Sequence, residues 1–331
     1  MKKEGSILKV SWIILLGTLL LSSCLKDDSA EKQAEHDRKL DDLKATYGMT
    51  ENDALEEGLY RKILTDTTTL TEREAIKSAD YLIVDVFGTY AFGEAFDASD
   101  ADIAEIAGIY RPDLVYGPYR LKLDRTFYGF YTALLGLKEG TKVQMVLSQD
   151  VAFLDYEPLA YEINILRVIH DLDAYDAWQD STYLVALGID PAVDVVPGTD
   201  STLFWKQIEP GTDSIDLELG DMVTLRLYGY YAETDPNYVS GFPGRQFFPI
   251  NESGDTLSGI VGEQSFPIIN SLYAAVAFMT MGEVREIFIP AEYAYGEDGF
   301  VHPYVGKYII PTNMSLHYYI QLLKHTKWDE Y

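Results

Sequence analysis

Cysteine and basic residues are scarce in this sequence of 331 residues. The single Cys excludes an intramolecular disulfide and any cysteine-rich metal site. The 26 Lys and Arg are outnumbered by 53 Asp and Glu, which gives a formal net charge of −27. A surface this acidic repels phosphate groups, so we expect no nucleic-acid partner and no docking on anionic lipid through a basic patch. Only five His occur and no pair has the spacing of metal ligands, so we expect no metal.

The apolar run at the N-terminus, Val10–Leu21, is short for a membrane-spanning helix, which needs about 20 residues. Basic residues up to Lys9 precede it, and the sequence Leu21-Ser22-Ser23-Cys24 ends it. This arrangement is typical of a signal peptide, and its last four residues resemble the lipobox of bacterial lipoproteins. We therefore predict a lipoprotein signal peptide over residues 1–23 and lipidation of Cys24. The alternative is a short N-terminal anchor that is never cleaved.

A charged segment, residues 24–49, follows the predicted lipidation site, and we expect a tether or a short helix there. It begins with Lys26-Asp27-Asp28, which is similar to the surface-export signal of one large phylum of Gram-negative bacteria. The alternative is a solvated charged tether. We expect an outer membrane lipoprotein that its acyl chains attach to the membrane. It would lie on the cell surface if the signal operates, and on the periplasmic face otherwise.

The remainder of the chain contains one pattern twice. Gly88 recurs at Gly229 with an offset of 141, and Tyr131 recurs at Tyr273 with an offset of 142. A near-constant offset over separated segments indicates a duplicated domain, because solenoid repeats are much shorter. The matching segments are GLYRKIL (58–64) with TLFWKQI (202–208), LIVDVFGTY (82–90) with TLRLYGYY (224–231), and the stretches 129–147 and 271–289.

We place the two copies at residues 50–171 and 200–331, with a linker at 172–199 that includes a helix. Alternating apolar residues in 284–289 and 315–323 predict strands, and the Ala-rich stretch 273–279 predicts a short helix. Each copy is therefore expected to be an α+β domain, an antiparallel sheet with one short helix packed on it.

The second copy carries the most specific motifs. Tyr293-Ala294-Tyr295-Gly296 is followed by His302-Pro303, by Ile309-Ile310-Pro311 and by a closing strand. These residues and their order resemble the FKBP-type peptidyl-prolyl isomerase family over roughly residues 200–325. Two departures from the family pattern are the missing glycines around His302-Pro303 and Thr312 in place of a second Pro.

The resemblance implies an apolar aromatic pocket that twists X–Pro bonds without a nucleophile, a proton shuttle or a cofactor. The barrier to that rotation is about 18–20 kcal/mol and comes from amide resonance. A pocket that disfavours the planar amide, with a hydroxyl that orients a carbonyl, can lower it. The resemblance assigns the hydroxyl donor to Tyr295 and the floor to Leu272, where many members have Trp. Its remaining catalytic positions are Ile269, Ile310 and Tyr318, and its substrate-binding positions are Tyr228, Ile268 and His302.

Other family features are weaker. The family's Phe-Asp turn is not recognisable in the second copy, where residues 232–265 hold an insertion and neither Phe247 nor Phe248 is favoured as its substitute. The first copy has a similar turn at Ala91–Ser99 and keeps Asp97 and Phe130. It has Phe153 at the position of the hydroxyl donor, and its loop is shorter by 15 residues. We expect it to fold alike and to lack activity.

The sequence therefore favours a peptidyl-prolyl isomerase or folding helper outside the cytoplasm, with a proline-containing peptide or an unfolded protein as its partner. The alternative is a non-catalytic binding lipoprotein of the same fold that holds an extended peptide or glycan. Leu272 and the missing turn favour this alternative, whereas the intact Tyr-Ala-Tyr-Gly run favours catalysis. Likeness of fold does not decide between them.

Overall fold

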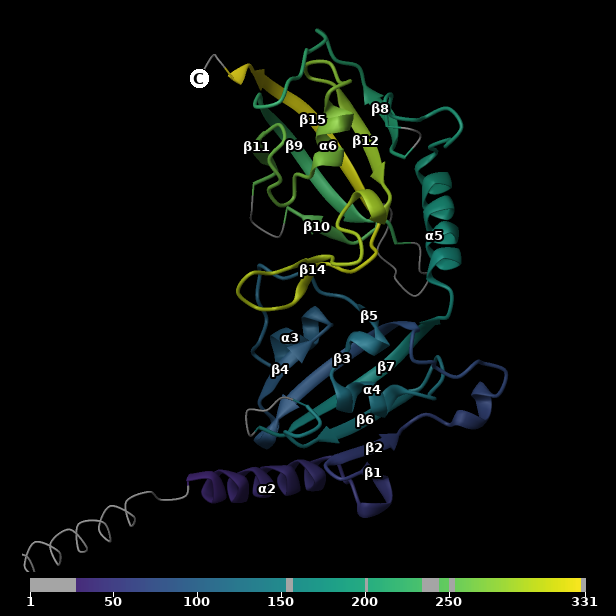
Figure 1. Ribbon diagram of the computed structural model, residues 1–331, viewed down its shortest axis with the longest axis vertical. Helices are drawn as coiled ribbons and strands as arrows, with labels where there is room; N and C mark the ends of the chain where they lie inside the picture. Colours follow the sequence, from purple (N-terminus) through teal and green to yellow (C-terminus); the bar gives the residue numbers. More distant parts are fainter. Residues whose placement is uncertain (1–27, 153–156, 200–201, 234–243, 250–253, 329–331) are drawn as a thin grey trace, which may run out of the picture.

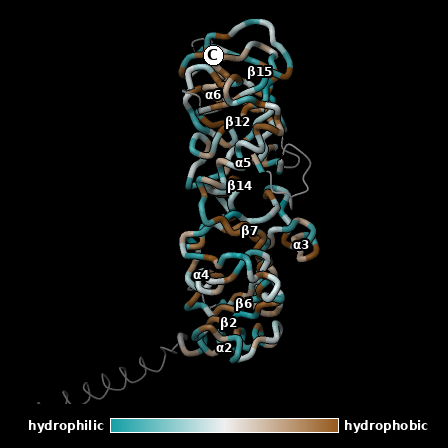
Figure 2. Tube along the Cα trace, turned by 90° about the vertical axis from the view of Figure 1, so that its right-hand side faces the viewer, coloured by the Kyte–Doolittle hydropathy of each residue, from teal (hydrophilic) through white to brown (hydrophobic). Residues whose placement is uncertain are grey.

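The computed structural model describes residues 28–152, 157–199, 202–233, 244–249 and 254–328. The predicted signal peptide, Cys24 and Lys26-Asp27 lie outside these residues, as does Phe153. Two antiparallel sheets, one in each half of the chain, are stacked along the long axis of the molecule (Figures 1 and 2). A short helix packs on each, so the expected α+β class is confirmed.

The first sheet has the strand order β1-β2-β6-β7-β3-β4, with β5 paired to β3. Its strands are β1 (Ala54–Glu56), β2 (Leu59–Ile63), β3 (Tyr81–Tyr90), β4 (Ala95–Ala98), β5 (Tyr119–Lys122), β6 (Lys142–Leu147) and β7 (Leu159–Ile169). The helices of this half are α2 (Asp28–Thr46), α3 (Ala101–Ile106) and α4 (Tyr128–Leu134), with the short 3-10 turns η1 (Glu51–Asp53), η2 (Thr67–Leu70), η3 (Ala91–Gly93) and η4 (Leu123–Arg125).

The second sheet has the order β10-β9-β15-β12-β8, with β11 paired to β9. Its strands are β8 (Phe204–Glu209), β9 (Met222–Tyr231), β10 (Gln246–Phe248), β11 (Thr256–Ile260), β12 (Val284–Ile289) and β15 (Leu316–Thr326). A separate hairpin, β13 (Phe300–Val301) with β14 (Tyr308–Ile310), lies between the two sheets (Figure 1). The helices are α5 (Leu172–Leu187) and α6 (Asn270–Val276), with the turn η5 (Ala291–Tyr293).

The two sheets have the same topology. Reading outward from β2, the order β2-β6-β7-β3-β4 matches β8-β12-β15-β9-β10, and β5 occupies the place of β11. Helix α4 lies between β5 and β6 in the chain, and α6 lies between the matching strands β11 and β12. The two helices therefore correspond. The shared topology agrees with the duplication that the offsets of 141 and 142 indicate.

Strand β9 shows why the sequence folds this way. Val223, Leu225 and Leu227 alternate with partly or fully exposed residues, and all three are completely buried. Because successive side chains of a strand point to opposite faces, these three lie on the face that packs in the core with α6. The residues between them, Thr224 and Arg226 among them, lie on the outer face.

A helix before each domain packs against the outer face of its sheet. Leu43 of α2 belongs to a buried cluster with Val146 and Ala160, and Leu184 of α5 belongs to one with Phe288 and Ala232. The two leucines are 141 residues apart, the offset of the duplication. Helix α5 starts at Asp171, whose carboxylate accepts a hydrogen bond from the N–H of Ala174, and it stops at Gly188 in the left-handed conformation. Each helix thus contributes to the hydrophobic packing of the domain that follows it.

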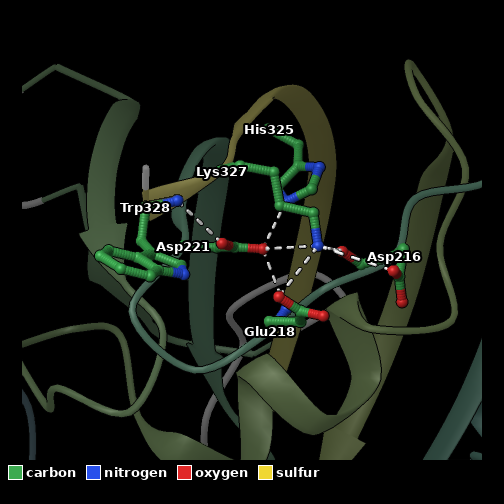
Figure 3. A network of polar contacts seen from close by, with 6 residues as sticks. All are labelled: Asp216, Glu218, Asp221, His325, Lys327 and Trp328. Carbon is green, nitrogen blue, oxygen red and sulfur yellow. Dashed lines mark hydrogen bonds and ion pairs between the residues drawn. The ribbon is translucent and has the colours of Figure 1, made fainter. Parts of the chain in front are cut away.

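A buried carboxylate ties the start of β9 to the end of β15 (Figure 3). Asp221 accepts hydrogen bonds from the N–H groups of Glu218 and Trp328, at 2.9 and 3.0 Å. Its Oδ2 lies 2.8 Å from Nε2 of His325 and 3.5 Å from Nζ of Lys327. In the first domain, Asp80 lies 2.8 Å from His170 in the same way. The Asp–His pair therefore links the start of β3 to the end of β7 in the first domain, and the start of β9 to the end of β15 in the second.

Among the described residues, no helix is long and apolar enough to cross a membrane. Within the same ranges, no group of three or more His, Cys, Asp and Glu could hold a metal ion.

Candidate functional site

The second domain brings most of the predicted site residues together. The side chains of Ile268, Ile269, Leu272, Ile310 and Tyr318 all belong to one hydrophobic cluster, and each is at most 3% exposed. They come from the loop before α6, from α6 itself, from β14 and from β15. The cluster therefore collects residues that are up to 50 positions apart in the sequence, as the family resemblance implies.

The loop before α6 is held in place by Tyr318. The Tyr318 hydroxyl donates to the carbonyl oxygen of Pro267, at 2.9 Å, across 51 residues of sequence. This bond satisfies the buried hydroxyl and fixes the backbone beside Ile268 and Ile269. Tyr318 is thus a wall of the site whose hydroxyl is already occupied.

Tyr295 is the residue of the site with a free hydroxyl. It follows η5, its side chain packs against the cluster, and its ring centroid lies 5.4 Å from that of Phe300. The hydroxyl oxygen is buried and has no hydrogen-bond partner among the described residues. Burial raises the pKa of this hydroxyl, so it stays protonated and can donate at neutral pH. A buried donor without a partner is costly, and an incoming carbonyl oxygen would satisfy it.

Aromatic rings that the sequence reasoning missed complete the walls. Phe266 and Phe300 are parallel, with centroids 4.6 Å apart, and Phe300 is the neighbour of Tyr295. Phe247 lies edge-on to Tyr318, with the ring centroids 5.6 Å apart. The Phe-Pro pair directly before Ile268 was the available signal for Phe266.

Two predicted substrate-binding residues lie elsewhere. Tyr228 is on the outer face of β9, where its hydroxyl donates to Asp255 at 2.6 Å and its ring packs on Tyr319. His302 is buried, but its Nε2 faces the first domain, 3.3 Å from Oδ2 of Asp113. The structure therefore separates Tyr228 and His302 from the hydrophobic cluster that contains the other assigned residues.

The first domain has an aromatic cluster at the equivalent place. Phe130 and Tyr161 are edge-on at 5.6 Å, and Phe96 and Phe127 pack around them. Asp97, which the sequence analysis singled out, accepts a hydrogen bond from the Tyr119 hydroxyl at 2.7 Å. The loop between β6 and β7 spans residues 148–158, against 290–315 between β12 and β15, which is the expected difference of 15. The first cluster thus has aromatic walls and only a short loop beside them.

The chemistry that the second cluster offers is narrow. Apolar and aromatic side chains surround the hydroxyl of Tyr295, and the assigned residues that the structure gathers in this cluster include no carboxylate, imidazole or amine. Such a site is suited to a neutral group with a carbonyl oxygen, and it provides no general base or nucleophile. Rotation about an amide bond is a reaction that needs neither.

Comparisons with known proteins agree with this chemistry. The sequence profile described as FKBP-type peptidyl-prolyl cis-trans isomerase matches residues 216–323. FK506-binding protein 1B of Aspergillus fumigatus is 33% identical over 106 residues, which cover 32% of this chain and 78% of that protein. The matched stretch contains every site residue that the resemblance assigned.

Solved structures with similar folds include the three FKBP domains of wheat FKBP73, with a TM-score of 0.32 and 16% identity over 82% of this chain and 96% of that one. FkpA of Escherichia coli has a TM-score of 0.33 and 18% identity over 51% of this chain and 75% of that one. With a curated relative matched over more than two thirds of its length, the chain belongs to the FKBP-type peptidyl-prolyl cis-trans isomerase family.

Proposed function

We propose that the second domain of this protein catalyses cis/trans isomerisation of X–Pro bonds in peptides or unfolded proteins. The observation that carries the proposal is the buried, unpartnered hydroxyl of Tyr295 beside the stacked rings of Phe266 and Phe300. Family membership supports the same activity in general.

The proposed mechanism rests on the difference between a planar and a twisted amide. A planar X–Pro amide has charge separation through resonance, and an apolar site stabilises the less polar twisted form relative to it. In this mechanism the proline ring packs against the apolar cluster at Ile269 and Ile310, and the buried side chain of Leu272 supports that cluster from the core. Tyr295 donates to a substrate carbonyl and fixes its orientation while the bond turns.

The test is an isomerisation assay on an X–Pro peptide with the full chain and its Tyr295→Phe variant. This change removes one hydroxyl and no packing volume, so we expect a loss of roughly 0.5–1.5 kcal/mol of transition-state stabilisation, a several-fold drop in kcat/KM. Tyr319→Phe is the matched control, since Tyr319 lies on the outer face beside Tyr228. Equal activity of the wild type and Tyr295→Phe would contradict the assigned role.

A second candidate is a non-catalytic binding module of the same fold that holds an extended peptide or glycan. Two observations favour it: Leu272 stands where many family members have Trp, and the family's Phe-Asp turn is not recognisable within residues 232–265. A proline peptide that binds the full chain with no acceleration of isomerisation would support this candidate over the first.

We also propose that the protein acts outside the cytoplasm as a lipid-anchored outer membrane protein. The basic residues, the short apolar run and the lone Cys24 in series support this proposal. Cys24→Ser should release the protein from membranes or leave residues 1–23 uncleaved. An unlipidated mature form in intact-mass analysis would overturn it.

Exposure on the cell surface is the finer part of this proposal. Lys26-Asp27-Asp28 directly after Cys24 supports it. Protease added to whole cells should then digest the wild-type protein, and replacement of the three residues by Ala should protect it. Protection of the wild type would instead favour the periplasmic face.

A further inference from the structure

The loop of the second domain that carries Ile310 also contacts the first domain. We call residues 296–315 the flap; it includes β13 and β14, which carries Ile310, and ends directly before β15, which carries Tyr318. Figure 1 shows β14 between the two sheets. Four flap residues, each from a different part of the flap, contact the first domain: Glu297, His302, Lys307 and Asn313.

The contact at Lys307 is an ion pair with both side chains largely buried, unlike the exposed pair of Glu297 with Arg125. Its Nζ lies 2.6 Å from Oδ1 of Asp97, and the two side chains are 24% and 18% exposed. The same Nζ lies 5.9 Å from the ring centroid of Tyr119, whose hydroxyl donates to Asp97. An ion pair that is largely shielded from water and joined to a hydrogen bond and an aromatic ring holds its geometry better than an exposed pair.

The other contacts surround this pair. Glu297 pairs with Arg125 at 3.1 Å on the surface, and Asn313 donates to the hydroxyl of Tyr81 at 3.2 Å. His302 faces Asp113 at 3.3 Å. A cavity of about 250 Å³ is lined by Lys307 itself and by residues of both domains, including Asp97 and Tyr119 of the first and Tyr231 and Tyr308 of the second.

Displacement of Lys307 would reach the catalytic site through the flap backbone. The N–H of His302 donates to the carbonyl oxygen of Lys307 at 2.7 Å, and Phe300 is paired with Ile310 across β13 and β14. The N–H of Asn313 donates to Gly296, directly after Tyr295, at 2.7 Å. A shift of Lys307 would therefore also shift Phe300, which lies beside Tyr295, and Ile310.

We propose that the first domain is an intramolecular clamp for the flap, and that Lys307 and Asp97 are positioning residues for isomerisation in the second domain. This inference rests on the proposed function. A clamped flap keeps Phe300 and Ile310 over the site and excludes water from it. The first domain thus contributes to the reaction through its contact with the flap.

The test uses the full chain with Lys307→Met, Asp97→Asn and the double variant. We expect each single change to lower kcat/KM for an X–Pro peptide about three- to tenfold, and the double change to add little, because both remove the same contact. Lys307→Arg keeps the positive charge, so this variant should retain most of the wild-type activity. Lys324→Met, an exposed lysine on β15, is the matched control.

Hydrogen exchange gives a readout that does not depend on activity. Amides of residues 297–313 should exchange faster in the single variants, whereas those of β9 and β15 should be unchanged. If the wild type lacks isomerase activity but the flap amides respond in this way, the proposed function fails and the clamp stands. Unchanged flap exchange and unchanged activity in both single variants would overturn the clamp.

Discussion

At the scale of single residues, Leu272 is both a position that the family resemblance assigns to the site and a fully buried residue of the core. The sequence comparison suggests that Trp at this floor position would improve the site, as in many relatives. In the structure Leu272 is completely buried between α6 and the sheet, with no exposed surface into which a larger ring could extend. Its packing therefore constrains the substitution as much as its function does.

We predict that Leu272→Trp lowers the free energy of unfolding by about 1–3 kcal/mol, because it overpacks a closed core. Leu272→Met conserves volume and should cost less than about 1.5 kcal/mol. Chemical denaturation of both variants measures the difference. A Trp variant as stable as the wild type would contradict the closed core at this position.

The buried Asp221 predicts how the second domain responds to acid. Burial alone would raise the pKa of its carboxyl, but the hydrogen bonds of its network outweigh burial and hold the pKa at about 2. Because this value is below the ordinary 3.8, the network stabilises the fold above pH 4 and loses that effect as the pH falls toward 2.

We therefore expect wild-type stability to fall between about pH 4 and pH 2, and Asp221→Asn to flatten that dependence. The variant should also lose about 1–3 kcal/mol at pH 7, since it leaves buried donors unsatisfied. Asp216→Asn is the control, because Asp216 also pairs with Lys327 but its side chain is 89% exposed. Thermal unfolding across this pH range checks both variants; equal slopes for Asp221→Asn and wild type would contradict the assignment.

The predictability of the site from sequence depended on how local each signal was. Tyr295 lies inside a contiguous motif, and Ile268 and Ile269 directly precede a helix, so their places followed from short stretches of chain. Tyr228 did not, because a shift of one residue along a strand moves a side chain to the opposite face. The contact of His302 with Asp113 joins two domains, and no local pattern encodes it.

At the scale of elements, α5 is a structural part of the second domain although the sequence analysis placed it in a linker. Leu184 and Tyr183 pack on Phe288, and Gln179 donates to the carbonyl oxygen of Ala232 at 2.8 Å. The apolar residues within 183–189 indicate from the sequence that one face of this helix is buried. The sequence does not indicate which surface that face covers, because its partner Phe288 is about 100 positions away. The strands were easier to predict, since alternation along β9 and β12 is a local property.

We predict that Leu184→Ala lowers the free energy of unfolding by about 2–5 kcal/mol, the usual range for a fully buried leucine. The neighbouring Val185 is 78% exposed, so Val185→Ala should change stability by no more than about 0.5 kcal/mol. Denaturant titration of the two variants provides the comparison. Equal stability would mean that α5 is only a connector between the domains.

At the scale of the whole molecule, duplication has produced two domains with one topology and different loops. Both retain an aromatic cluster and a buried carboxylate paired with a His. They differ in the loop before the last strand, where the second domain has 15 more residues. The sequence revealed the duplication and this difference, because both are visible along the chain. It could not reveal that the longer loop docks on the other domain.

The division of labour between the domains can be tested with two fragments, 28–170 and 171–331. Each contains a complete sheet and its covering helix, so circular dichroism should show that both fold. We predict that 171–331 accelerates cis/trans exchange of an X–Pro peptide and that 28–170 does not, because only the second domain has Tyr295 and the long flap. The clamp adds a quantitative expectation: 171–331 should be several-fold less efficient than the full chain, by about the same factor as Lys307→Met. Equal activity in both fragments would show that the flap and the hydroxyl are not required. Full activity in 171–331 would show that its flap is held without the first domain.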